Sequence, residues 1–119
     1  MARILLADDD AATRDLVQRA LATDGHTVVP TQDGAEALEK LQGGGPFDLL
    51  ISDVQMPGVD GIELVGKAVA AEPKLRVVLM SGFADELTRA DHLKSRIARV
   101  ITKPFTLDQV RTVVRDVLA

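Results

Sequence analysis

The sequence contains no cysteine, no tryptophan and no tyrosine, and phenylalanine occurs only three times in 119 residues. Without cysteine there can be no disulfide, no thiolate nucleophile and no Cys-ligated metal. The scarcity of aromatic rings argues against a surface that stacks nucleic-acid bases. No apolar run approaches the length of a membrane span, and the N-terminus lacks the apolar segment of a signal peptide. We therefore expect a cytoplasmic protein with no membrane contact.

A dominant charge of one sign is also missing. The net charge is −4 at pH 7, with acids and bases interspersed, so no basic footprint for direct nucleic-acid binding is present. The hydrophobic share of 46% is ordinary for a globular protein. No linker, repeat or low-complexity tail interrupts the chain. We expect one domain over residues 1–119.

Short apolar runs alternate with segments of helical periodicity five times. Strands are expected over residues 3–7, 27–30, 48–52, 75–80 and 98–101, and helices over about 11–23, 34–41, from 60 or 61 to before Pro73, about 85–94, and after a cap at Thr106. Pro30 should close an edge strand, and the 85–94 helix has the weakest apolar pattern. This alternation predicts an α/β fold, a doubly wound (flavodoxin-like) parallel sheet with strand order 2-1-3-4-5 and helices on both faces.

The stretch Phe47 to Gly61 organises the chain. Its apolar run, Leu49 to Ile51, is typical of a strand buried on both faces of a parallel sheet. Asp53 follows, and Met56-Pro57-Gly58 then stops extended structure. A carboxylate is thus expected at the carboxyl end of a central strand, where open α/β sheets bind their ligands.

Polar side chains also follow the other strands. The first, third, fourth and fifth expected strands end at Asp8 and Asp9, Asp53, Ser81 and Lys103. Neighbouring strands lie about 4.8 Å apart, so these groups can meet at one sheet edge. Each residue taken alone has a plainer explanation: a helix cap for the acids, a turn for Asp53, a strand-end cap for Ser81 and a solvated surface for Lys103. It is improbable that four such separate structural explanations apply by chance at one edge of the sheet.

Three clustered acids imply a cation, because two carboxylates about 4 Å apart repel by about 4 kcal/mol at an effective dielectric near 20. Oxygen ligands with open positions suit Mg²⁺, which favours one or two carboxylates plus a phosphate. An ammonium and a hydroxyl can bind phosphate oxygens. A carboxylate in these surroundings can attack phosphorus and form an aspartyl phosphate.

With these pieces in order, the chain resembles the receiver domain of two-component response regulators, of the chemotaxis (CheY-like) type. The resemblance covers essentially the whole chain and rests on Leu6–Asp10, Asp53–Gly61, Met80–Gly82 and Lys103–Phe105. It implies the fold expected above. It also implies that a sensor histidine kinase or a histidine phosphotransfer protein is the phosphodonor, and that an output protein, which the sequence does not name, is the partner.

The resemblance assigns roles to individual residues. Asp53 would accept the phosphoryl group, and Asp9 and Asp53 would coordinate Mg²⁺ directly. Asp8, acting mainly through water, and the backbone carbonyl of Gln55 would complete the metal site. Lys103 would contact the phosphoryl oxygens. Ser81 would swing to bind the phosphoryl group and so report its presence.

Two positions bear on switching and on the lifetime of the acyl phosphate. The family usually has an aromatic switch residue three places before the lysine, and this chain has Val100 there. Its signal would then travel by rearrangement of the loop near Gly82–Ala84. Phe83 and Gln55 occupy the places that tune loss of the acyl phosphate, and we hypothesise that Phe83 hinders the attacking water.

We therefore expect a signalling switch with no output domain within these residues, whose only reactions are self-phosphorylation and autodephosphorylation. The start at Met1 is typical of a stand-alone regulator, whereas Met80–Ala84 is similar to receivers of hybrid kinases and to a cell-cycle receiver that controls delivery of substrates to an ATP-dependent protease. The alternative is a Mg²⁺-dependent phosphohydrolase of the haloacid-dehalogenase type. Those enzymes need a second acid two residues after the nucleophile, and Gln55 stands there.

Overall fold

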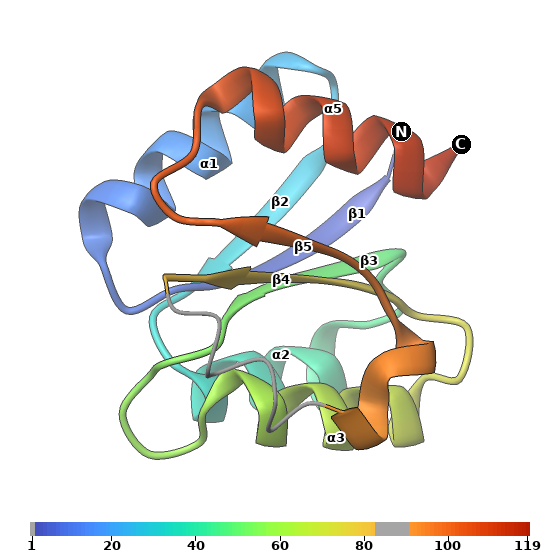
Figure 1. Cartoon of the computed structure of the whole chain (residues 1–119). Helices are drawn as coiled ribbons and strands as arrows, with labels where there is room; N and C mark the ends of the chain where they lie inside the picture. Colours follow the sequence, from blue (N-terminus) through green and yellow to red (C-terminus); the bar gives the residue numbers. More distant parts are fainter. Residues whose placement is uncertain (1, 83–90) are drawn as a thin grey trace.

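The computed structural model describes residues 2–82 and 91–119, which form a parallel sheet between two layers of helices (Figure 1). The strands are β1 (Arg3–Ala7), β2 (Thr27–Thr31), β3 (Leu49–Asp53), β4 (Arg76–Ser81) and β5 (Ile97–Thr102). The α-helices of the described residues are α1 (Ala11–Thr23), α2 (Gly34–Gly44), α3 (Gly61–Ala71) and α5 (Leu107–Leu118), and η1 (Asp91–Arg96) is a 3₁₀ helix. None of these helices is long and apolar enough to cross a membrane.

The strand order is β2-β1-β3-β4-β5, and every pairing is parallel, which confirms the predicted topology. Helices α1 and α5 cover one face of the sheet, while α2 and α3 cover the other (Figure 1). Alternate residues of β1 therefore enter different cores. Leu5 packs in the core beneath α2 and α3, whereas Ile4 and Leu6 pack in the core beneath α1 and α5. Burial on both faces explains why the central strands are continuously apolar.

Side-chain caps set where the helices begin. Asp10, Asp33 and Asp60 each accept a hydrogen bond from a backbone N–H in the first turn of α1, α2 and α3. Thr106 caps α5 as predicted and forms a reciprocal capping box with Gln109. These caps start each helix directly after the loop that leaves the carboxyl end of a strand.

The prediction that Pro30 closes the second strand is wrong, because β2 continues to Thr31. The N–H of Asp8 donates to the carbonyl of Thr31, so Thr31 faces β1 and Pro30 faces the open edge. A missing N–H on that side costs no ladder hydrogen bond. The hydroxyl of Thr31 also donates to the carbonyl of Leu6 and holds the end of β2 in place.

Other predicted boundaries differ by a few residues. β3 includes Asp53 as its last residue, and β4 and β5 also end one residue later than expected. The helix predicted to stop near Leu41 continues to Gly44, since glycine is tolerated in the last turn of a helix. Of the helix predicted at 85–94, residues 85–90 lie outside the described residues, and 91–94 belong to the 3₁₀ helix η1. Leu16 of α1 is 50% exposed, although it belongs to the apolar residues that recur at helical spacing in this segment.

Gly61 allows α3 to begin directly against the end of β3. A Cβ atom at this position would lie 2.0 Å from the carbonyl oxygen of Asp53, a distance that no side chain can occupy. The N–H of Gly61 instead donates to the carbonyl of Val54 at 2.8 Å. The first turn of α3 therefore fixes the backbone that carries Asp53.

An ion pair distant in sequence ties α5 to the end of α1. The guanidinium of Arg111 donates to both carboxylate oxygens of Asp24, at 2.6 to 3.1 Å. These hydrogen bonds and the positive charge lower the pKa of Asp24 below its ordinary value of 3.8. Because the folded-state pKa is depressed, the stabilisation is present above pH 3.8 and is lost as pH falls through the folded-state pKa.

We predict that Gly61→Ala destabilises the fold by about 1–3 kcal/mol, because the added methyl group must displace the backbone at Asp53. The matched control is Gly43→Ala in α2, where a Cβ meets nothing within 4 Å and alanine should stabilise by about 0.4–1 kcal/mol. Urea denaturation of both variants measures the two free energies. Equal effects would show that close approach at Gly61 does not constrain the fold.

We predict that Asp24→Asn lowers the melting temperature at pH 7 and that this difference shrinks as pH is lowered below 3.8, where the wild-type carboxylate also becomes protonated. Asp15→Asn, which removes the exposed partner of Arg19 on the same helix, should have little effect at either pH. Thermal denaturation followed by circular dichroism measures both. A pH-independent loss in Asp24→Asn would contradict the electrostatic explanation.

Candidate functional site

The carboxyl ends of β1 and β3 bring the predicted acids together. Asp8 follows β1 directly, and Asp53 is the last residue of β3, whose partner strands on either side are β1 and β4. Asp8, Asp9 and Asp53 each offer a carboxylate oxygen, and these oxygens all lie within 4.8 Å of one another. Asp8 and Asp53 are buried, while Asp9 is exposed. The predicted cluster of three carboxylates is therefore present.

Lys103 completes the cluster from the end of β5. Its Nζ donates to Oδ2 of Asp53 at 2.9 Å and lies 3.5 Å from Oδ2 of Asp8. Burial by itself would lower the pKa of this ammonium, but the carboxylates of Asp53 and Asp8 outweigh burial and raise it. The N–H of Lys103 also donates to the carbonyl of Ser81 at 2.8 Å, which anchors the turn after β5.

Among the three acids, Asp8 is the one with a buried carboxylate oxygen that accepts no hydrogen bond from the described residues. Burial, reinforced by the negative charges of Asp53 and Asp9, raises its pKa, although the backbone N–H of Asp10 and the charge of Lys103 act in the opposite direction. Its Oδ1 accepts from the N–H of Asp10 at 2.9 Å. Its Oδ2 is buried and accepts no hydrogen bond within residues 2–82 and 91–119, and the ammonium of Lys103 lies 3.5 Å from it. One ammonium beside three carboxylates leaves two negative charges uncompensated.

The loop from β1 to α1 is held by two further side chains. Asp10 caps α1 by accepting from the N–H of Ala12 and the hydroxyl of Thr13, so it faces the helix rather than the acid cluster. The guanidinium of Arg14 donates to the carbonyl of Asp8 at 2.7 Å. Arg14 was not among the residues predicted from the sequence. The only available signal was a basic residue in the first turn of the helix that starts at the acid triplet.

Ser81 lies at the same edge of the sheet as the acids. It is the last residue of β4, it is 2% exposed, and the residue before it, Met80, pairs in register with Asp53. Gln55 lies two residues beyond Asp53 in the loop to α3 and is exposed. The predicted roles of Ser81 as phosphoryl sensor and of the Gln55 carbonyl as metal ligand remain predictions.

Of the two remaining predicted positions, Val100 is not part of this cluster. Val100 lies within β5, not at its end, and is 39% exposed. Phe83 lies outside the described residues. The hypothesis that Phe83 hinders the attacking water therefore remains a prediction.

The donor set fits a small divalent cation. Three carboxylates within 4.8 Å of one another repel by about 3 kcal/mol per pair at an effective dielectric near 20. A doubly charged ion would neutralise the two uncompensated charges and supply a partner for the orphaned Oδ2 of Asp8. All the ligand atoms are oxygens, and Asp9 is open to solvent, which suits an ion that keeps several waters.

Residues 4–115 match the family model described as "Response regulator receiver domain". The response regulator receiver protein CpdR of Brucella abortus is 42% identical over 107 residues, which cover 90% of this chain and 88% of that protein. The sensor kinase CckA of Brucella abortus is 34% identical over 98% of this chain. This chain spans only 12% of that kinase.

Solved structures agree with the sequence comparisons. A CheY-like receiver domain protein from Methanospirillum hungatei superposes with a TM-score of 0.90 at 26% identity, over 99% of this chain and 94% of that one. The response regulator TrrA from Thermotoga maritima, crystallised in complex with Mg²⁺ and BeF, gives a TM-score of 0.86 at 29% identity, over 99% of this chain and all of that one. The chain therefore belongs to the response regulator receiver domain family.

Proposed function

We propose that this chain is a phosphorylation-controlled switch that accepts a phosphoryl group on Asp53 from a phosphohistidine donor. The observation that carries the proposal is the ammonium of Lys103, 2.9 Å from Asp53 and 3.5 Å from Asp8, at the edge of an acid cluster suited to a divalent ion. Family membership supports this role, since receivers act as phosphoacceptors in two-component systems. Family members include a segment of a sensor kinase, which supports a histidine kinase or a histidine phosphotransfer protein as donor.

In the proposed reaction a carboxylate oxygen of Asp53 attacks phosphorus in line with the leaving imidazole. The new oxygen–phosphorus bond forms as the nitrogen–phosphorus bond breaks, and the electron pair returns to the imidazole nitrogen. Lys103 is placed to bind a phosphoryl oxygen, because its ammonium already contacts the nucleophile. The hydroxyl of Ser81 would bind a second oxygen.

The ion we propose for the acid cluster is Mg²⁺, held by Asp9 and Asp53, with Asp8 through water and the carbonyl of Gln55 completing the site. When bound, it would neutralise charge on the phosphoryl oxygens. The TrrA structure, whose complex contains Mg²⁺ and BeF, supports this choice of ion. Arg14 would support the site by donating a hydrogen bond to the backbone carbonyl of Asp8.

Phosphorylation would shift an equilibrium between two conformations and change the affinity of an output protein for the surface around β4 and β5. The change would begin at Ser81 and at Lys103, which end β4 and follow β5 and are joined by a backbone hydrogen bond. We place this function in the cytoplasm, because a donor kinase would draw on ATP.

We also propose that the chain has no turnover on external phosphate esters. A haloacid-dehalogenase-type phosphatase needs a general acid two residues after its nucleophile, and Gln55 cannot protonate a leaving group. In an assay with p-nitrophenyl phosphate and Mg²⁺ we expect no product beyond one equivalent. Sustained turnover that disappears in Asp53→Asn would instead establish the phosphatase.

We predict that Mg²⁺ stabilises the wild-type chain by about 1.4 kcal/mol at ten times its dissociation constant, because the ion binds only the folded acid cluster. Asp9→Asn should abolish this stabilisation. Asp10→Asn is the matched control, since asparagine keeps the helix cap and Asp10 does not face the cluster. Thermal denaturation with and without Mg²⁺ measures the shift. An equal shift in Asp9→Asn would place the ion elsewhere.

We predict that acetyl phosphate with Mg²⁺ adds one phosphoryl group to the wild-type chain and to Asp10→Asn, but none to Asp53→Asn, which lacks the nucleophile. Lys103→Met should slow labelling by at least about tenfold, because the charge that stabilises the transferred group is gone. Intact-mass spectrometry follows both. Labelling of Asp53→Asn at the wild-type rate would contradict the assignment of the acceptor.

A further inference from the structure

The two edges of the sheet are protected differently. On β2, Pro30 occupies a position whose backbone faces the open edge, so that edge lacks one donor for a further strand. β5 contains no proline, and β4 is its only partner strand among the residues that the structure describes. A bulge between Val77 and Val78 confines its regular pairing to the part from Arg99 to Thr102.

The outward-facing backbone groups of β5 follow from its pairing with β4. The N–H of Lys103 donates to Ser81 of β4, and backbone groups alternate sides along a strand. The N–H and C=O of Val100 and Thr102 therefore point away from the sheet. Within residues 2–82 and 91–119 no backbone or side-chain group hydrogen-bonds to them. Both residues are exposed.

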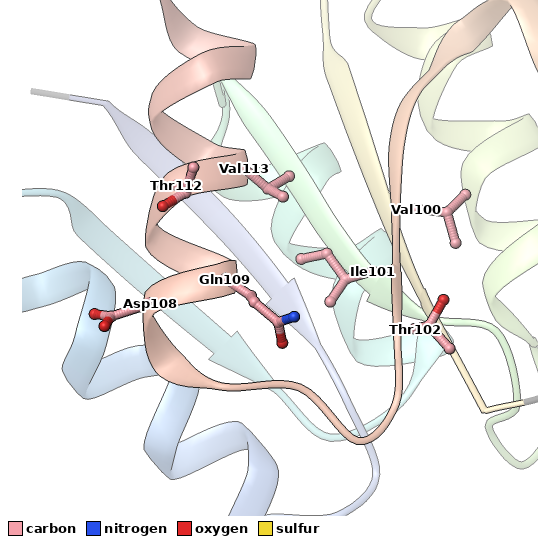
Figure 2. Close-up of a pocket in the computed structure, with 7 residues that line it drawn as sticks. All are labelled: Val100, Ile101, Thr102, Asp108, Gln109, Thr112 and Val113. Carbon is pink, nitrogen blue, oxygen red and sulfur yellow. The ribbon is translucent and has the colours of Figure 1, made fainter.

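A groove of about 440 Å³ lies beside this edge, between β5 and α5. Figure 2 shows Ile101 pointing towards α5, where Val113 and Gln109 lie, whereas Val100 points to the other side of β5. The wall on α5 is completed by Thr112 and Asp108. A strand added to β5 would place alternate side chains in this groove, against the apolar floor made by Ile101 and Val113.

Cations gather at the amino end of the same edge. Lys94 and Arg96 lie in the last turn of η1, which leads directly into β5, and within the described part of the chain no carboxylate pairs with either. The guanidinium of Arg96 donates to the carbonyls of Pro73 and Leu75, in the segment that leads into β4. Arg99 pairs with Asp116 at 3.6 Å with both side chains about half exposed, a contact that contributes little stability and can be exchanged.

We propose that β5 is a strand-addition site for an extended segment of a partner protein, with alternating apolar side chains and with acidic residues at the end that lies beside Arg99. The main-chain hydrogen bonds would come from Val100 and Thr102, and the α5 groove would select the apolar side chains. The biological use of the site rests on the proposed output role of this surface. Peptide binding at β5 needs no phosphoryl transfer. A failure of strand addition can therefore be distinguished from a failure of Asp53 phosphorylation.

The probes are two blocked, fluorescein-labelled peptides, Glu-Glu-Val-Thr-Val-Thr and its reverse order Thr-Val-Thr-Val-Glu-Glu, which allow for a parallel or an antiparallel strand. We expect one of them to bind the unphosphorylated wild-type chain saturably in fluorescence anisotropy, with NMR shifts concentrated at the amides of Val100 and Thr102. Both alternate N-methylation patterns of that peptide are tested, and the one that blocks the N–H groups facing β5 should bind at least about tenfold more weakly, because it has lost the donors to the edge strand.

The matched protein variants are Val100→Pro and Val100→Ala. Proline removes only the outward N–H and spares the ladder to β4, so it should weaken binding at least about tenfold, whereas alanine should leave it within about twofold. Arg99→Gln should weaken binding and reduce its salt dependence. Circular dichroism confirms that each variant is folded, and if Val100→Pro does not fold, the N-methylated peptides alone decide.

Three results would overturn the proposal. The first is no saturable binding by either peptide. The second is unchanged binding by Val100→Pro or by both N-methylated peptides, which would mean that the edge of β5 is not used. The third is concentration-dependent dimerisation in sedimentation velocity that Val100→Pro abolishes, because the occupant of the edge would then be a second copy of this chain.

Discussion

The structure depends on holding three carboxylates within 4.8 Å of one another against their mutual repulsion. Lys103 offsets part of that repulsion, and the remaining two negative charges create a demand for a divalent ion or a proton. Asp8 shows the effect of this repulsion most directly, since it is buried, its pKa is raised and one of its oxygens accepts no hydrogen bond from the described residues. A pocket in this condition could hold a metal ion.

The rest of the fold keeps these charges from moving apart. β1 and β3 are adjacent, buried on both faces and rigidly paired, so Asp8 and Asp53 cannot separate without breaking the centre of the sheet. Gly61 lets α3 press against the backbone of Asp53, and Arg14 holds the carbonyl of Asp8. Lys103, in contrast, lies in a turn after β5, where its backbone N–H donates to Ser81 at the end of β4. The positive charge of the cluster is thus supplied from beyond the two central strands that carry Asp8 and Asp53.

The topology and the acid cluster were predictable because both follow from short-range patterns. Apolar runs that end in Asp8, Asp53, Ser81 and Lys103 require only that parallel strands end on one edge. Features that depend on which side of a strand faces a partner were not predictable. Proline usually ends a strand, but β2 continues past Pro30 to Thr31. Arg14 donates to a backbone carbonyl, and no sequence motif identifies such a contact. The groove beside β5 likewise depends on the placement of α5, which periodicity does not specify.

The central claim is that the acid cluster holds a divalent ion beside a reactive aspartate. The most direct measurement is an anomalous difference map from crystals soaked in Mn²⁺, which takes the same oxygen ligands as Mg²⁺. The account predicts one strong peak about 2.1 Å from carboxylate oxygens of Asp9 and Asp53. A map in which that position is empty while Mn²⁺ occupies another site, or in which the Lys103 ammonium alone fills the pocket, would contradict it.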